Sequence, residues 1–282
     1  MHGGVRPTPP YCARWVTVDT RHDHVVESEE VLTGGNVAAQ VVRVGSTVRK
    51  PSLVQTAGVE AVLSHLAEKQ FEGAPRTLGR DECGRHVLEY IPGAIAEALL
   101  PFSPDELRRV GRLIRELHDA METFQPPSDV TWQMVVPNPA GGDLICHNDL
   151  APWNLVRDDQ RWVFIDWDNA GPSSRLWDLG YAASAFVPFV PRGDVEVDGP
   201  RLRALVDGYG LDLEQRLALP AQIAAHTQGM YELLVRGDRT GEQPWARLYA
   251  EGHGDHWGPA AAYIEEHHDA WVTALVSDYP SS

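Results

Sequence analysis

Cysteine is scarce in this chain of 282 residues, and its three cysteines (Cys12, Cys83 and Cys146) lie far apart. Their spacing matches no zinc-ligand pattern, and an odd, sparse set does not form a disulfide scaffold. Long apolar runs are also lacking, since none approaches the ~18 residues of a membrane-spanning helix. We therefore expect a cytoplasmic protein without a signal peptide or membrane contact.

Basic side chains are few, with 24 Lys and Arg against 40 Asp and Glu, for a net charge of −16. A nucleic-acid partner is disfavoured, because a phosphate backbone requires a basic surface. Residues 1–90 carry 11 acidic and 10 basic side chains, so almost all of the excess negative charge lies in the rest of the chain. The negative charge after residue 90 favours a cationic small molecule as ligand, although acidic surfaces also keep proteins soluble.

One segment beginning at Leu144 carries most of the chemical information, LICHNDLAPWNLVRDDQRWVFIDWDNAGPSSRLWDLG. Within it, Leu155–Arg157 and Trp162–Ile165 flank a polar turn and predict a β-hairpin. Such a hairpin would bring Asp166 back beside Asn154.

The polar residues of this segment suit Mg²⁺-dependent phosphoryl transfer. Asp149 can orient an attacking hydroxyl and accept its proton, and Asn154 and Asp166 can hold the metal ions that bridge nucleotide phosphates. Mg²⁺ prefers hard oxygen ligands, few of them from protein. His147 lies in the same loop.

The motifs HNDLAPWN and IDWD together resemble those of the aminoglycoside phosphotransferase-like enzymes, which include choline and homoserine kinases. The resemblance spans roughly Val31 to Leu179. Protein kinases have H-R-D-x-x-x-x-N and D-F-G at these places, whereas this chain has Asn148 for the Arg and Trp167-Asp168 for Phe-Gly. The missing Arg argues against control by activation-loop phosphorylation.

The resemblance implies an α+β, two-lobed protein-kinase-like fold. We expect a small antiparallel-sheet lobe that binds nucleotide over residues 1–92, and a mainly helical catalytic and substrate-binding lobe over residues 93–282. A turn at Pro92-Gly93 supports this boundary. Beyond Asp178, which matches a family aspartate that braces the catalytic loop, helices are expected at 201–218, 220–236, 243–252 and 259–276.

Several residues of the first lobe are candidates for nucleotide binding. Gly34 and Gly35 lie between two predicted strands, where their backbone N–H groups could approach phosphate. Lys50 and Arg49 compete for the role of phosphate-contacting cation. Lys50 shares a strand face with Val48, which favours Lys50 if Val48 lines the pocket, but the register is open.

Two further nucleotide-site expectations follow from the resemblance. Glu60, near the start of a predicted helix over 58–70, corresponds to the family glutamate that pairs with the strand cation. The segment HVLEYIP corresponds to the hinge between the lobes, where adenine would bond the backbone around Glu89 and Ile91.

The leading functional hypothesis is an ATP-dependent kinase of a small-molecule hydroxyl, with Mg²⁺ as cofactor and GTP as the alternative nucleotide. A cationic antibiotic, either an aminoglycoside or a tuberactinomycin-type peptide, is the first choice of acceptor. Acidic residues that could bind its ammonium groups are Asp194, Glu196, Asp198, Glu232 and Asp238.

Other functions remain open at this point. Choline, another amino alcohol or homoserine is the metabolic alternative, and nine tryptophans allow an aromatic cage for a quaternary nitrogen. A non-catalytic nucleotide-binding module is disfavoured, because it would need no proton acceptor. A metal hydrolase using His147, Asp149, Asp166 and Asp168 would have no need of Asn154.

Overall fold

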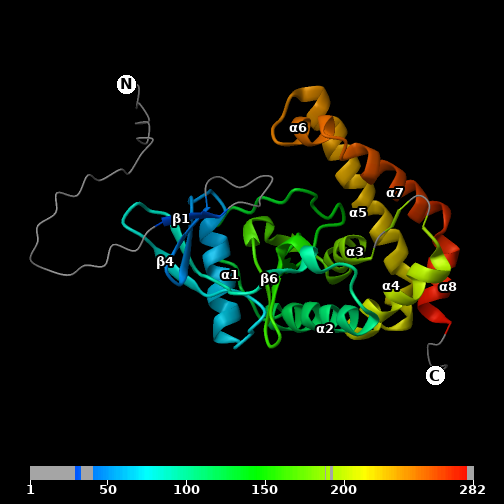
Figure 1. The fold of residues 1–282 in the computed structure, drawn as a ribbon, viewed down its shortest axis with the longest axis horizontal. Coiled ribbons are helices and arrows are strands. Elements are labelled where there is room, and N and C mark those ends of the chain that lie inside the picture. The colour runs from blue at the N-terminus through cyan, green and yellow to red at the C-terminus, as the bar shows by residue number, and fades with distance from the viewer. Residues whose placement is uncertain (1–28, 33–40, 188, 191–192, 278–282) are drawn as a thin grey trace, which may run out of the picture.

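A computed structural model describes residues 29–32, 41–187, 189–190 and 193–277 (Figure 1). The elements in chain order begin with β1 Glu29–Leu32, β2 Val41–Val44, β3 Thr47–Lys50, α1 Thr56–Glu68, β4 Thr77–Arg80 and β5 His86–Glu89. These strands form an antiparallel sheet in the order β1-β2-β3-β5-β4. The expected antiparallel sheet of the amino-terminal lobe is confirmed.

Helix α1 is amphipathic, and its apolar stripe explains its packing. Val59, Val62, Leu63 and Leu66 recur at helical spacing and are at most 2% exposed. They belong to a hydrophobic core that continues into the helical half of the molecule.

The chain leaves the first sheet at Glu89 and then pairs with a different one. Strand β6 (Ala94–Ile95) pairs with β8 (Leu155–Arg157), which pairs in turn with β9 (Trp162–Phe164). The predicted hairpin over 155–165 is therefore present. We propose Pro92 as the boundary between the lobes, because it lies between the strands of the two sheets.

Helix α2 (Pro104–Met121) underlies the second half of the molecule (Figure 1). At its start, Ser103 and Glu106 form a capping box, and Pro104 lies in the first turn. The connecting pieces are η1 Ala96–Leu99, β7 Leu144–Cys146, η2 Pro152–Asn154, η3 Trp167–Asn169 and β10 Gly171–Ser173.

The remaining chain is helical, as expected. It comprises α3 Arg175–Phe186, α4 Val195–Tyr209, α5 Leu213–Thr240, α6 Trp245–Ala250, α7 Gly254–Glu266 and α8 His268–Val276. No helix in the described part of the chain is long and apolar enough to cross a membrane.

The boundaries of these helices correct the sequence prediction. The break expected near residue 219 lies at Gly210, which ends α4 with a φ of 81°. Asp212 and Gln215 then form a capping box that starts α5. Helix α5 runs on through Pro220 to Thr240, so this proline does not separate two helices.

Candidate active site

The catalytic loop predicted around Asp149 joins β7 to η2, and a buried histidine organises its backbone. His147 is fully buried, its Nε2 lies 3.1 Å from the Ile165 carbonyl, and its Nδ1 accepts the backbone N–H of Asp149 at 3.2 Å. Burial lowers the pKa of His147, which keeps the ring neutral. Because both ring nitrogens are engaged, His147 is a brace and not a metal ligand, which argues against the metal-hydrolase alternative.

Asp149 is half-buried, and its two carboxylate oxygens differ. Oδ1 accepts a hydrogen bond from the Tyr181 hydroxyl at 2.8 Å, whereas Oδ2 accepts a longer one, at 3.4 Å, from Asn169 Nδ2. Burial raises the pKa of Asp149, which makes its carboxylate a better proton acceptor than an ordinary aspartate. Oδ2 is therefore the less tightly hydrogen-bonded of the two oxygens.

Asp178, from the first turn of α3, binds the backbone of the catalytic loop. Its Oδ1 accepts the Asn148 N–H at 2.8 Å, and its Oδ2 lies 3.0 Å from His118 Nε2. His118 Nδ1 is 2.8 Å from the Tyr209 hydroxyl. Asp178 and His118 are both completely buried, so this hydrogen-bonded network gives the strained Asn148, with a φ of 58°, one fixed position.

The hairpin brings the two predicted metal ligands together. The Ile165 N–H donates to the Asn154 carbonyl at 2.8 Å, so Asp166 follows directly beside Asn154. Asn154 Nδ2 donates to the Asp149 carbonyl at 3.0 Å, which ties this pair to the catalytic loop. Asp166 itself has a φ of 59°, a left-handed conformation that turns the chain into η3.

Lys50 reaches this cluster from the first lobe. Its Nζ lies 2.8 Å from Asp166 Oδ1 and 2.7 Å from Asp168 Oδ2. Burial alone would lower the pKa of Lys50, but the two carboxylates raise it, so the ammonium stays charged. Burial raises the pKa of Asp168.

Arg49, the alternative candidate for the phosphate-contacting cation, points away from Asp166 and Asp168. Arg49 donates to Thr47 Oγ1 at 2.8 Å and lies 3.3 Å from Asp81. Alternation along β3 separates the two side chains, so Lys50 and not Arg49 approaches the predicted metal ligands.

The expected pairing of Glu60 with the strand cation is wrong. The Glu60 carboxylate takes two hydrogen bonds from Arg80, at 2.9 and 3.1 Å. A planar guanidinium matches a carboxylate with two parallel bonds, while Lys50 is already held by two other carboxylates. Asp166 and Asp168 thus take the place that the family resemblance assigned to Glu60.

The two residues expected at the hinge differ in the hydrogen bonding of their backbone N–H groups. The Glu89 N–H donates to the Arg76 carbonyl, and the Tyr90 N–H donates to the Ser46 carbonyl, each at 2.9 Å. These two donors are therefore committed to protein partners. Among the described residues no acceptor is found for the Ile91 N–H.

Other predicted residues lie outside the cluster. Gly34 and Gly35 fall outside the described residues. Asp194 accepts the Glu196 N–H at the start of α4, and Asp198 is buried near Arg201. Glu232 accepts Gln228 on exposed α5 surface. No contact with the Asp149 cluster is found for these acidic residues or Asp238 in the described part of the chain.

The loop after α2 lies beside the cluster and connects distant elements. A Cβ placed on Gly58 of α1 would lie 2.7 Å from the Trp132 ring, and one placed on Gly171 would lie 2.8 Å from Met134. Farther along, Trp177 Nε1 donates to the Val136 carbonyl at 3.2 Å. The loop therefore packs against α1, β10 and α3 in turn.

Two contributors to the site were missed from sequence, namely Tyr181 and Asn169. Both contact the Asp149 carboxylate from elements that follow the motif. Tyr181 stands one helical turn after Asp178, so the helical spacing from the recognised aspartate was the available signal.

A groove elsewhere on the surface does not belong to this site. It has a volume of about 450 Å³ and lies where α2 meets the β8–β9 hairpin, with Arg109, Arg112 and Trp162 in its lining. It includes none of the predicted catalytic or metal-binding residues. The assignment therefore depends on the chemistry of the clustered side chains.

Comparison with known proteins agrees with this geometry. Residues 129–219 match the model of the phosphotransferase enzyme family. The trifolitoxin immunity protein of Rhizobium leguminosarum bv. trifolii is 32% identical over 204 residues, which cover 68% of this chain and 77% of that protein.

Solved structures share the fold. A choline/ethanolamine kinase family protein from Mesorhizobium loti aligns with a TM-score of 0.60 at 17% identity, covering 89% of this chain and 92% of its own. An amicoumacin kinase, solved with AMP-PNP, Ca²⁺ and its ligand, aligns with a TM-score of 0.61 at 15% identity, covering 86% and 88%. The two-lobed kinase-like fold is thereby confirmed.

Proposed function

Because this chain belongs to the phosphotransferase enzyme family and is a small-molecule phosphotransferase, we propose that it transfers the γ-phosphate of ATP to an acceptor hydroxyl with Mg²⁺. The observation that carries this proposal is the convergence of Lys50, Asp166 and Asp168 beside Asn154 and Asp149. A nucleotide-binding module would not need a proton acceptor at this place.

The residues present fit a hard divalent cation. A positive group, the Lys50 ammonium, already lies between the oxygens of Asp166 and Asp168. The carboxylates of Asp166 and Asp168 and the amide oxygen of Asn154 form a set of hard oxygen donors, which Mg²⁺ prefers. When bound there, Mg²⁺ would supply positive charge that neutralises the triphosphate.

The chain's own groups account for the remaining chemistry. Asp149 accepts the proton of the acceptor hydroxyl as the hydroxyl oxygen bonds to the γ-phosphorus. The bond from that phosphorus to the β-γ bridging oxygen breaks, ADP leaves with its electrons, and Asp149 returns the proton to solvent. Lys50 faces the phosphates, and the Ile91 N–H is the proposed donor to the adenine ring.

We propose an antibiotic or peptide toxin with a hydroxyl group as the acceptor. The immunity function named for the Rhizobium relative supports a protective reaction, and the excess of negative charge supports a cationic acceptor. An amino alcohol such as choline is the second candidate, because a choline/ethanolamine kinase family protein shares the fold.

A phosphorylation screen tests the proposal. The purified chain with Mg²⁺ and ATP, or GTP in parallel, is incubated with aminoglycosides, tuberactinomycins, hydroxyl-bearing peptide toxins, choline and homoserine. We expect one acceptor to gain a phosphate ester in step with nucleotide consumption, and Asp149→Asn to slow this reaction by about 10²–10⁴. Nucleotide consumption with free phosphate as the sole product would overturn the proposal.

A further inference from the structure

Helix α3 contacts the catalytic loop at two points that lie one turn apart. Asp178 accepts the Asn148 N–H, and Tyr181 donates its hydroxyl to Asp149 Oδ1. Residues three apart share a helix face, so both contacts come from the same side of α3. The first holds the backbone of the loop, whereas the second holds the reacting carboxylate itself.

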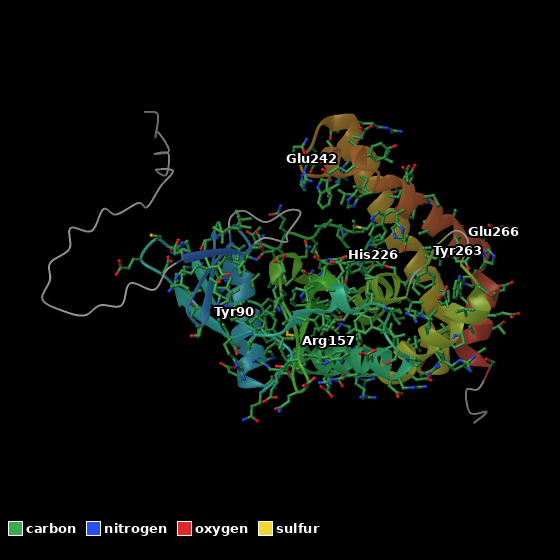
Figure 2. The ribbon with its side chains drawn as sticks, viewed as in Figure 1. Tyr90, Arg157, His226, Glu242, Tyr263 and Glu266 are labelled. Atoms are coloured by element: carbon green, nitrogen blue, oxygen red, sulfur yellow. The ribbon has the colours of Figure 1, made fainter. Side chains whose placement is uncertain are left out.

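The Tyr181 ring has little freedom to move. The side chain is 5% exposed, and its ring centroid lies 4.7 Å from that of His226 on α5. Trp177 packs against the same imidazole at 5.0 Å. Burial lowers the pKa of His226 to about 4, so the ring is a neutral packing partner. Figure 2 shows His226 among the side chains of the helical half.

From this geometry we infer that Tyr181 is a positioning residue, which fixes the Asp149 carboxylate so that Oδ2 faces the acceptor hydroxyl. The inference rests on the proposed function and specifies the oxygen that takes the proton. Burial raises the pKa of the Tyr181 hydroxyl far above its usual range. The hydroxyl therefore remains a donor and cannot compete for the substrate proton.

The hydrogen bond from Tyr181 to Asp149 is directional, and for this reason Tyr181 should affect kcat. The Asp149 carboxylate would otherwise rotate about its terminal torsion, which is broad for aspartate. A bond to a charged group is worth about ten- to a hundredfold in an equilibrium constant. Loss of this bond should lower kcat, because the acceptor must then meet a misaligned base.

The test compares Tyr181→Phe with Tyr263→Phe. Tyr263 is equally buried, at 5%, and its hydroxyl has no hydrogen-bond partner in the described part of the chain. It lies in α7, farther from the first sheet than His226 (Figure 2). Both variants remove one buried hydroxyl, but only the first removes the contact with Asp149.

We expect Tyr181→Phe to lower kcat for acceptor phosphorylation by roughly ten- to a hundredfold. The Kd for MgATP and the KM for the acceptor should stay within about twofold, and Tyr263→Phe should match the wild type. An unchanged kcat, or a loss of MgATP binding parallel to that of kcat, would overturn the inference.

A second measurement does not need the acceptor. The unfolding midpoints of Tyr181→Phe, Asp149→Asn and the double variant form a double-mutant cycle. Non-additive shifts are expected, and additive shifts would overturn the contact. If the wild type phosphorylates no acceptor, the proposed function fails, and this cycle alone decides whether Tyr181 holds Asp149.

Discussion

Lys50 Nζ lies 2.8 Å from Asp166 Oδ1, although 116 residues separate them in the chain. One residue belongs to the sheet of the first lobe and the other follows the hairpin of the second. Their contact joins the proposed phosphate-binding and metal-binding elements at one point. The candidate active site therefore takes residues from both halves of the fold.

Replacing Lys50 with Ala should weaken MgATP binding by roughly ten- to a hundredfold, because a charged hydrogen-bonding partner of the phosphates is lost. Isothermal titration calorimetry measures this directly. Arg49→Ala is the matched control, since the Arg49 side chain contacts Thr47 and Asp81 instead. Equal losses in the two variants would contradict the assignment of Lys50.

Asp149→Asn should lower kcat by about 10²–10⁴, the range for a general base that also orients its substrate. The Kd for MgATP should remain close to that of the wild type, because Asp149 faces the acceptor. Single-turnover kinetics with saturating nucleotide separates the two effects. Wild-type turnover in this variant would remove Asp149 from the mechanism.

Asp166→Ala should abolish the dependence of nucleotide binding on Mg²⁺, since a carboxylate is the strongest protein ligand for this ion. Asn154→Ala should have a milder effect, because a neutral amide contributes less. Calorimetric titrations at several Mg²⁺ concentrations check both. Asp168→Ala then shows whether the second carboxylate binds metal or only Lys50.

If the acceptor is polycationic, kcat/KM should fall steeply as salt is added. Electrostatic steering is screened beyond about 10 Å at 0.1 M ionic strength, and the excess of acidic residues lies after residue 90. The measurement uses the best acceptor at low and moderate salt with Mg²⁺ saturating. A flat profile would favour homoserine or another acceptor without net positive charge.

The free energy of unfolding should decrease as pH falls from about 6.5 to 4, partly through His86. Burial lowers the pKa of His86 to about 4, so the unfolded chain binds the proton first and is favoured at low pH. The effect is at most about 3 kcal/mol. His86→Asn should flatten the profile, measured by urea unfolding across this range, whereas the control His268→Asn at a partly exposed site should not.

Local sequence determined the chemistry of the catalytic loop and the hairpin that follows it. Apolar strands around a polar turn bring Asn154 and Asp166 together within one hairpin, so their proximity needs only short-range structure. The capping box of Ser103 and Glu106 is equally local, because the two residues that start α2 stand three apart in the chain. Period-two alternation also separated Lys50 from Arg49.

Only the tertiary structure decided the partners of long side chains. Glu60 meets Arg80 and Lys50 meets Asp166, because the packing of α1 on the sheet, and of one lobe on the other, sets which charges come within reach. Tyr181 acquires its contact with Asp149 only when α3 packs behind the loop. Spacing along the chain therefore determined which groups are available for catalysis, while packing between distant elements determined which partners their side chains contact.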